Sequence, residues 1–341
     1  MSRLGKNTVQ LTIAMVGQKA LAFFYFLLLA RMIGAESTGA YFLALSITTM
    51  FSVLTDFGLQ PVLIREVAKE KPDWHRLVRN TLSLKLVFVA VSALLVIGFV
   101  HVMGYDPLVR SLVYVALGVM ALDAVSLTMF GVLRGKQMLT YESVGMFTGQ
   151  LLTVVFGAAV LFMHAPLVWL VAALLLGSLF NAVFATVMAA RRVGDSDLLR
   201  PEWSTSFIRP LIKVALPFAL AGIFVKIYSY VDTLTIAHFF SETEVGIWAV
   251  AYKLTYAFQF LPLAFVAALY PAFSDLVSRN DPDLSRVFHQ AMLYMAFLAA
   301  PIVFGIWAVA DPLIAISVGS EFSASAPILG TLVFVLIFIF L

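Results

Sequence analysis

The stretch that decides the fold is TLSLKLVFVAVSALLVIGFVHVM, residues 81–103, a long and mostly apolar run in which Lys85 is the only Lys, Arg, Asp or Glu. A helix needs about 20 mostly apolar residues to cross the hydrocarbon core of a bilayer. Similar runs recur along the whole chain, and the last begins near Pro327 and continues to Leu341. The sequence therefore predicts about 10 membrane spans, at residues 8–32, 39–64, 81–103, 109–132, 142–163, 167–190, 211–240, 247–273, 289–310 and from 327 onward.

The composition of the whole chain is typical of a polytopic membrane protein. Of its 341 residues, 62% are hydrophobic and 12% are charged, and the mean hydropathy is +0.99. A soluble domain carries about 25% charged residues, so this chain has too little charge to cover a globular surface. A soluble enzyme and a nucleic-acid binder are thereby excluded. The absence of cysteine excludes disulfides, thiolate metal sites and cysteine nucleophiles.

The distribution of basic residues predicts the orientation in the membrane. Loops that follow odd-numbered spans contain no Lys or Arg, whereas 15 of the 22 basic residues lie in the N-terminal tail or in the even-numbered loops. Basic loops stay in the cytoplasm, so we expect the N-terminus and the even-numbered loops on the cytoplasmic side. The 15 residues are Arg3, Lys6, Arg65, Lys69, Lys71, Arg76, Arg79, Arg134, Lys136, Arg191, Arg192, Arg200, Arg209, Arg279 and Arg286.

Two parts of the chain are related by a repeat. An ungapped offset of 207 residues places Lys19 on Lys226, and both residues lie deep inside long apolar spans. Parallel repeats in transporters are related by an axis along the membrane normal. We therefore expect an all-α fold of two six-span lobes with a pseudo-twofold axis, the second lobe being truncated. The expected parts are an N-lobe at residues 1–190, a basic cytoplasmic linker at 191–210 and a C-lobe with spans seven to ten at 211–341.

Lys19 and Lys226 are the first candidates for a binding site. Each lies too far from the ends of its span for the side chain to reach the membrane surface, so each must face protein or a wet cavity. Two cations in one lumen would bind an anionic headgroup, and we therefore predict that both contact substrate. The alternative is that each lysine is buried against a carboxylate as part of the packing.

Asp232 and Lys253 form a second candidate pair. They lie at about equal depth in a hairpin of two spans, which predicts a structural ion pair. The alternative is ion coupling, in which Asp232 takes up a proton and releases a lysine during the transport cycle.

Two further intramembrane carboxylates have separate interpretations. Asp123 has no partner in its own hairpin, so it either binds a coupling cation or proton or stays neutral in a helix contact. Asp56 lies closer to the cytoplasm, and Lys85 is its expected partner.

The remaining motifs indicate packing rather than chemistry. Gly131–Gly135 and Gly145–Gly149 are GxxxG pairs, which predict close helix contacts. No catalytic constellation is evident, and three histidines near outer span ends lack the spacing of metal ligands: His101, His164 and His238. The sequence predicts no catalytic residues, no metal site and no cofactor.

Three segments carry a family resemblance: ARMIGAESTGAYFLALSITTMFSVLTDFGLQPVLIREVAKEK at 30–71, YVDTLTIAHFFSETEVGIWAVAYKL at 230–254 and DPLIAISVGSEFSASAPIL at 311–329. With them the chain resembles the polysaccharide-transport, O-antigen flippase-like branch of the multidrug/oligosaccharidyl-lipid/polysaccharide (MOP) exporter superfamily. The resemblance implies a transporter in the bacterial cytoplasmic membrane that flips an undecaprenyl-pyrophosphate-linked oligosaccharide to the outer leaflet. Its expected partners are the lipid-linked oligosaccharide, the lipid bilayer and polysaccharide polymerase or assembly proteins, with no nucleic acid.

Two other functions are weighed against this one. A multidrug cation antiporter of the same superfamily would place acids rather than paired lysines at the bilayer midplane. A membrane-embedded polymerase or glycosyltransferase would need a large extramembrane loop with acid and base groups, and no predicted outer loop is long enough. We therefore predict a transporter and no enzyme.

Overall fold

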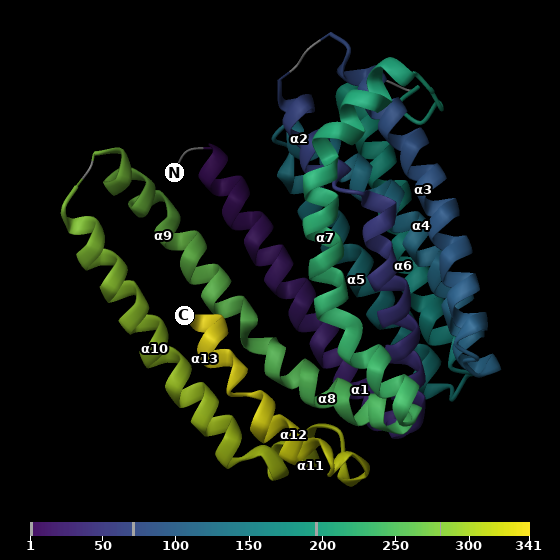
Figure 1. The fold of residues 1–341 in the computed structure, drawn as a ribbon, viewed down its shortest axis with the longest axis vertical. Helices are drawn as coiled ribbons and strands as arrows, with labels where there is room; N and C mark the ends of the chain where they lie inside the picture. The colour runs from purple at the N-terminus through teal and green to yellow at the C-terminus, as the bar shows by residue number, and fades with distance from the viewer. Residues whose placement is uncertain (1–2, 70–71, 195–196, 280) are drawn as a thin grey trace. The chain divides into compact units, whose positions relative to one another are not determined.

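The computed structural model describes residues 3–69, 72–194, 197–279 and 281–341, including all side chains there except those of 3–13, 267, 268 and 271. Within these ranges all regular secondary structure is helical (Figure 1). Eight of the described helices are long and apolar enough to cross a membrane, which confirms the predicted all-α membrane fold. The first two predicted spans count as one helix here, and the last is represented by the shorter apolar stretch Ser325–Phe340.

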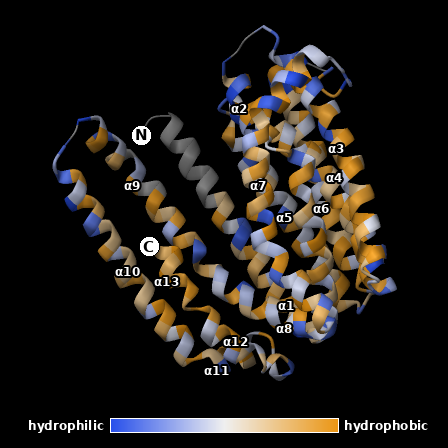
Figure 2. Ribbon diagram, viewed as in Figure 1, coloured by the Kyte–Doolittle hydropathy of each residue, from blue (hydrophilic) through white to orange (hydrophobic). Residues whose placement is uncertain are grey.

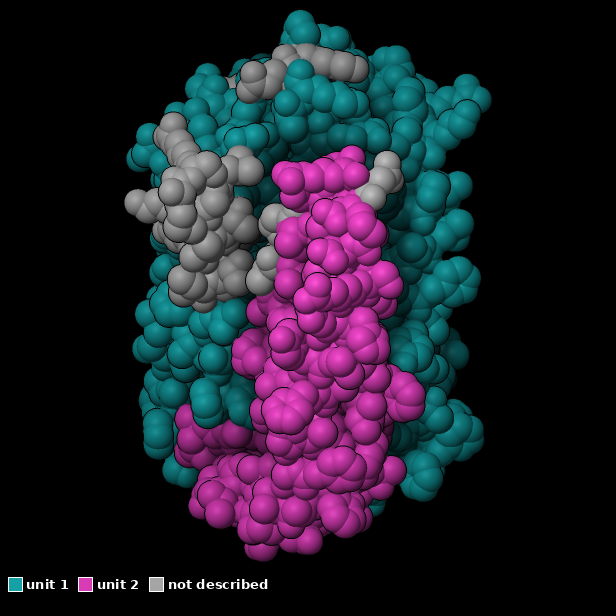
Figure 3. Space-filling view, turned by 90° about the vertical axis from the view of Figure 1, so that its left-hand side faces the viewer, with its two compact units in different colours: residues 1–25, 39–245 teal, residues 26–38, 246–341 magenta. Residues whose placement is uncertain are grey.

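The chain forms two compact units, which are described separately. Unit 1 comprises residues 1–25 and 39–245, and unit 2 comprises residues 26–38 and 246–341 (Figure 3). Helix α7, Thr205–Phe239, belongs to unit 1 although it follows the predicted linker at 191–210. The division into an N-lobe and a C-lobe thus remains a prediction.

Helix α1, Arg3–Asp56, is broken at Gly34, which has φ 79° and ψ 176°. A residue with positive φ interrupts the helical hydrogen-bond ladder, and glycine adopts this conformation without steric cost. The N–H of Ala35 donates to Glu321 Oε1 at 2.7 Å, and Arg31 donates to the carbonyl of Ile316 at 2.6 Å. Within unit 2, the α1 break is therefore tied to residues near the C-terminal end of the chain.

Unit 1 places six further helices around the second half of α1. The predicted spans from 81 to 240 match five of them with ends that differ by at most seven residues, whereas the predicted span 39–64 is wrong as one helix. It ends at Asp56, because Phe57 and Gly58 have φ of 46° and 67°, and a new helix then begins. The helices are α2 Leu59–Ala68, α3 Trp74–Val102, α4 Pro107–Gly135, α5 Leu139–Phe162, α6 Val168–Val193 and α7.

Small residues allow the helices of unit 1 to approach closely. A Cβ on Gly135 would lie 2.8 Å from a methyl carbon of Val67 on α2, and one on Gly145 would lie 2.6 Å from the ring of Phe130. Larger side chains at these positions would force the helices apart. The prediction that the two GxxxG pairs serve helix packing is confirmed.

Basic loops of unit 1 meet at one end of its helices. An apolar cluster there joins α2, the start of α3 and the ends of α4 and α6, and includes Trp74. Lys136 Nζ lies 4.7 Å from the Trp74 ring centre, and Arg76 pairs with Glu202 at 2.8 Å. Hydrophilic residues gather at this end while apolar residues follow the helices (Figure 2). The side chains of Arg3, Lys6 and Lys71 lie outside the described residues.

Unit 2 contains the broken segment of α1, the part of α8 from Gly246 onward and the helices after it. The predicted span 247–273 contains a 3-10 turn at Ala257–Gln259, so α8 and α9 are separate helices. The helices are α8 Glu242–Tyr256, α9 Phe260–Ser278, α10 Asp283–Ala308, α11 Ala310–Ser317, α12 Ser325–Leu332 and α13 Val335–Phe340.

Candidate functional site

A polar cavity of about 340 Å³ lies inside unit 1. One face of α1 and one face of α4 form its walls, because residues three and four apart share a helix face. Gln60 of α2, Lys85 of α3 and Lys226 of α7 complete the lining. On α4 the lining spans residues 116–127, the middle of a helix that runs from 107 to 135. The cavity therefore lies at membrane depth.

Hydroxyl groups of α1 line this cavity. Thr48 donates to the carbonyl of Ala44 at 3.0 Å, and Ser52 donates to the carbonyl of Thr49 at 2.7 Å. Thr55 makes the same type of bond to the carbonyl of Ser52 at 2.7 Å. Each hydroxyl proton is thus used by the helix, and each oxygen keeps acceptor capacity toward the cavity.

The predicted Asp56–Lys85 ion pair is confirmed. Lys85 Nζ lies 2.6 Å from Asp56 Oδ1, and the side chain of Lys85 is only 1% exposed. Neither atom makes a further hydrogen bond to any described residue. An ammonium group has three donors, so a single carboxylate oxygen leaves part of its capacity unused.

Lys226, predicted to bind substrate, also lines the cavity. Its Nζ lies 5.5 Å from the ring centre of Tyr230, one turn further along α7, which stabilises the cation through its interaction with the ring. Lys19, its predicted counterpart, is exposed on α1 and is not among the residues that line this cavity. The cation that shares the cavity with Lys226 is Lys85.

Asp123 faces the same cavity from α4. The side chain of Ser178 on α6 interacts with its carboxylate. Lys85, on the other helix of the same hairpin, lines this cavity too, but its described ion pair is with Asp56. The partner of Asp123 is a hydroxyl from a helix that the sequence pattern does not place next to it.

Asp232 and Lys253 fall in different units, so their predicted pairing stays a prediction. Asp232 Oδ1 accepts a hydrogen bond from the N–H of Thr233 at 2.6 Å. Lys253 Nζ lies 5.5 Å from the ring centre of Phe26, within unit 2.

Sequence reasoning missed Lys85 as a lining residue and the hydroxyl face of α1. Lys85 was assigned only as the partner of Asp56, although a charge inside a span is itself a signal for a functional site. The hydroxyls carried a second signal, because Thr48, Ser52 and Thr55 recur at helical spacing.

Membrane-spanning helices around a polar cavity that contains two lysines define a membrane transporter. The chain belongs to the family described as polysaccharide biosynthesis protein, whose model matches residues 4–277.

Individual relatives agree with this class. The chain is 23% identical over 331 residues to the probable low-salt glycan biosynthesis flippase Agl15 of Haloferax volcanii, covering 96% of this chain and 67% of the relative. An inward-facing multidrug resistance MATE family transporter of the MOP superfamily is 17% identical with a TM-score of 0.69, covering 97% of this chain and 81% of that one. A eukaryotic MATE transporter is 11% identical with a TM-score of 0.65, covering 99% and 80%.

These relatives are named as a flippase and as transporters, not as enzymes. The predictions of a transporter rather than an enzyme and of a resemblance to polysaccharide flippases are thereby confirmed. The structural likeness at these identities shows the fold alone.

Proposed function

We propose that this transporter moves an undecaprenyl-pyrophosphate-linked oligosaccharide from the cytoplasmic to the outer leaflet by alternating access. The observation that carries the proposal is that Lys85 and Lys226 line one cavity at membrane depth. Two ammonium groups in a membrane interior repel each other, and an anionic headgroup offsets this repulsion through charge-assisted hydrogen bonds. The relative named as a glycan biosynthesis flippase supports a lipid-linked glycan as the substrate.

Within this proposal, Lys226 contacts the pyrophosphate, and Lys19 provides a second contact during the cycle. The test is complementation of a deletion strain, with outer-leaflet sugar display measured at matched membrane abundance. Lys226→Ala and Lys19→Ala should each abolish display, and arginine at either position should partly restore it because it keeps the charge and grips phosphate with two donors.

Lys213→Ala is the matched control, since Lys213 lies on the same helix as Lys226 but is exposed and outside the cavity lining. Its display should equal that of the unchanged protein. Normal display in the Lys19→Ala, Lys226→Ala double variant would show that these lysines are not the headgroup site.

The proposed direction of transport requires a cytoplasmic N-terminus, as the basic loops predict. Cysteine introduced at Ser37 or Ser320 should react with an impermeant thiol reagent added to intact cells, and cysteine at Ser278 should not. Labelling of the Ser278 variant in sealed cells would show that the orientation is the opposite one.

Polysaccharide polymerase or assembly proteins are the partners expected to consume the flipped glycan.

A multidrug cation antiporter is the second candidate, because Asp123 supplies a carboxylate to the cavity. Its test is resistance of cells to cationic drugs on expression of the protein. Resistance that disappears in Asp123→Asn, together with unchanged sugar display in the deletion strain, would favour the antiporter.

A further inference from the structure

We propose that Asp56 is a built-in counter-ion for Lys85, and that the diphosphate group of the substrate displaces it. The inference rests on the proposed function, since it assumes that an anion enters the cavity of unit 1. It adds Lys85 as an anion-binding residue and Asp56 as the residue that controls its availability.

The coordination of Lys85 is the first reason. Its side chain is the more deeply buried partner, and its sole described counter-group is the Asp56 oxygen at 2.6 Å. A buried ammonium is stable only when its donors are satisfied by several acceptors. A diphosphate offers more oxygens and more charge than one carboxylate. It can therefore replace Asp56 at Lys85 while also contacting Lys226 across the same lining.

The position of Asp56 is the second reason. It is the last residue of α1, and the next residue, Phe57, has a left-handed φ of 46° that is unfavourable for a bulky side chain. An ion pair that anchors Asp56 to α3 helps to hold this bend. A carboxylate at the end of a helix can also swing away from its partner with less disturbance than one in the middle of a helix.

The bend itself contacts α7. A Cβ added to Gly58 would lie 2.7 Å from both the carbonyl oxygen of Ala215 and the backbone nitrogen of Ala219. The same α3 that carries Lys85 also holds the start of α7. Asn80 Oδ1 accepts from the N–H of Ser204 at 2.6 Å, and Arg76 pairs with Glu202 at 2.8 Å. One helix therefore connects the ion pair to the contact between α7 and the bend.

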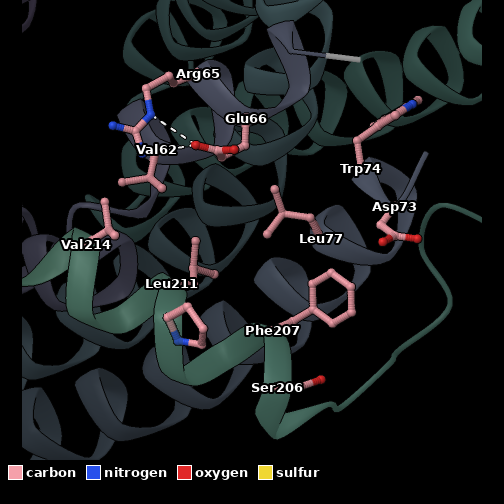
Figure 4. Close-up of a pocket in the computed structure, with 11 residues that line it drawn as sticks. Val62, Arg65, Glu66, Asp73, Trp74, Leu77, Ser206, Phe207, Leu211 and Val214 are labelled. Atoms are coloured by element: carbon pink, nitrogen blue, oxygen red, sulfur yellow. Dashed lines mark hydrogen bonds and ion pairs between the residues drawn. The ribbon is translucent and has the colours of Figure 1, made fainter. Parts of the chain in front are cut away.

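The contact of α7 with α2 and α3 buries an apolar cluster that includes Leu59, Leu84 and Ala215, but it is not filled along its whole length. A hollow of about 370 Å³ lies along it. Figure 4 shows Phe207 and Leu211 of α7 around this hollow, with Val62 and Leu77 from α2 and α3. When the anion takes Lys85, Asp56 loses its anchor, the bend loosens and α7 can move away. When the anion leaves, the Asp56–Lys85 pair re-forms and the buried charge of Lys85 is again compensated.

The test is binding of inorganic pyrophosphate to the purified full chain in lipid nanodiscs, measured by calorimetry. Because Asp56→Asn removes the competitor and keeps the site, it should bind pyrophosphate about tenfold more tightly than the unchanged protein. Lys85→Met should lose this binding, also when combined with Asp56→Asn. Equal affinities of Asp56→Asn and the unchanged protein would overturn the proposal.

Asp123→Asn is the matched control, because it removes one negative charge from the same cavity but not from Lys85. Its affinity should change much less than that of Asp56→Asn. An equal gain in pyrophosphate affinity in both variants would mean that only the net charge of the cavity matters, and it would overturn the proposed displacement of Asp56. Should Asp56→Asn not survive purification, pyrophosphate in the buffer should restore its folded yield. Failure of that rescue would count equally against the proposal.

The source of the anion and the proposed function are tested separately. Undecaprenyl pyrophosphate in the nanodisc should compete with pyrophosphate if the lipid headgroup is the ligand, whereas a soluble anion alone would leave the titration unchanged. Tight pyrophosphate binding by Asp56→Asn, together with normal sugar display in the deletion strain, would refute the flippase function and support the displacement of Asp56 by the anion. Lost sugar display in the deletion strain, with no effect of Asp56→Asn on pyrophosphate binding, would support the flippase function and refute the displacement.

Discussion

Two ion pairs of unit 1 are built in opposite ways. Glu142, at the start of α5, is 2% exposed and accepts two hydrogen bonds from the guanidinium of Arg134, which reaches solvent with 38% of its side chain. In the Asp56–Lys85 pair the cation is the buried member, while the carboxylate is 27% exposed and makes one contact. The planar guanidinium of Arg134 donates to both carboxylate oxygens of Glu142, whereas the ammonium of Lys85 keeps unused donors beside a cavity. The first arrangement fixes structure, and the second permits exchange.

The largest expected effect comes from breaking the Arg134–Glu142 pair. Arg134→Met leaves Glu142 buried without its partner, which should destabilise the protein by about 3–5 kcal/mol. Thermal unfolding in detergent measures the loss of stability. Arg134→Lys should lose less stability than Arg134→Met, because lysine keeps the positive charge but lacks the two-donor geometry of the guanidinium. Stability equal to that of the unchanged protein would remove the distinction between the two pairs.

Most of the fold could be predicted from the sequence, because the bilayer imposes a minimum length on every apolar helix. The spans from 81 to 240 are examples. The bend at Phe57 and Gly58 was missed because the apolar run resumes after it, although Gly58 and Pro61 are residue types that end helices. The break is a backbone conformation fitted to α7. The 3-10 turn at Ala257–Gln259 was also missed, although Pro262 in the first turn of α9 is a residue type that interrupts helices.

The site could be predicted only in part. Charges inside spans indicated Lys226, Asp123 and the Asp56–Lys85 pair, because each carries a cost that must be offset locally. Which of them share a cavity depends on how helices rotate about their axes, and a repeat offset does not determine that rotation. Hence Lys85 lines the cavity with Lys226, and the contact of Asp123 with Ser178 went unforeseen.

A third pair tests whether the comparison extends beyond unit 1. If Asp232 and Lys253 form the predicted structural pair, removing either partner should destabilise the protein by about 1–3 kcal/mol. Exchanging the two residues should restore most of the folded protein, measured as membrane abundance and thermal stability. An Asp232→Asn variant that is fully stable yet inactive in sugar display would instead show that Asp232 is not part of a structural pair and would favour a proton-coupling role.

Lys85→Met should separate function from stability in the second type of pair. Because Asp56 is partly exposed, water can solvate its carboxylate once the lysine is gone, so the loss of stability should be about 1 kcal/mol. Sugar display at matched abundance should fall about tenfold, equivalent to about 1.4 kcal/mol. Lys213→Met, exposed on α7 and outside the cavity lining, should change neither measurement. A display loss no larger than that of Lys213→Met would make the Asp56–Lys85 pair purely structural.

The smallest effect concerns three charged residues near the protein surface, outside the candidate membrane spans. Glu66 on α2 accepts hydrogen bonds from Lys69 at 2.7 Å and from Arg65 at 3.1 Å, and these contacts, Lys69 first, hold the pKa of Glu66 below its usual value. A carboxylate with a lowered pKa in the folded state contributes stability above its unfolded pKa of about 4.3. That contribution is lost as the pH falls through the folded value. Compared with Glu66→Gln, the unchanged protein should therefore be more stable at pH 6 by about 0.2–1 kcal/mol, and the two should converge under strongly acidic conditions. Thermal unfolding of both proteins across this range measures the difference. A gap that widens toward acid would show that Lys69 and Arg65 do not stabilise the charged form of Glu66.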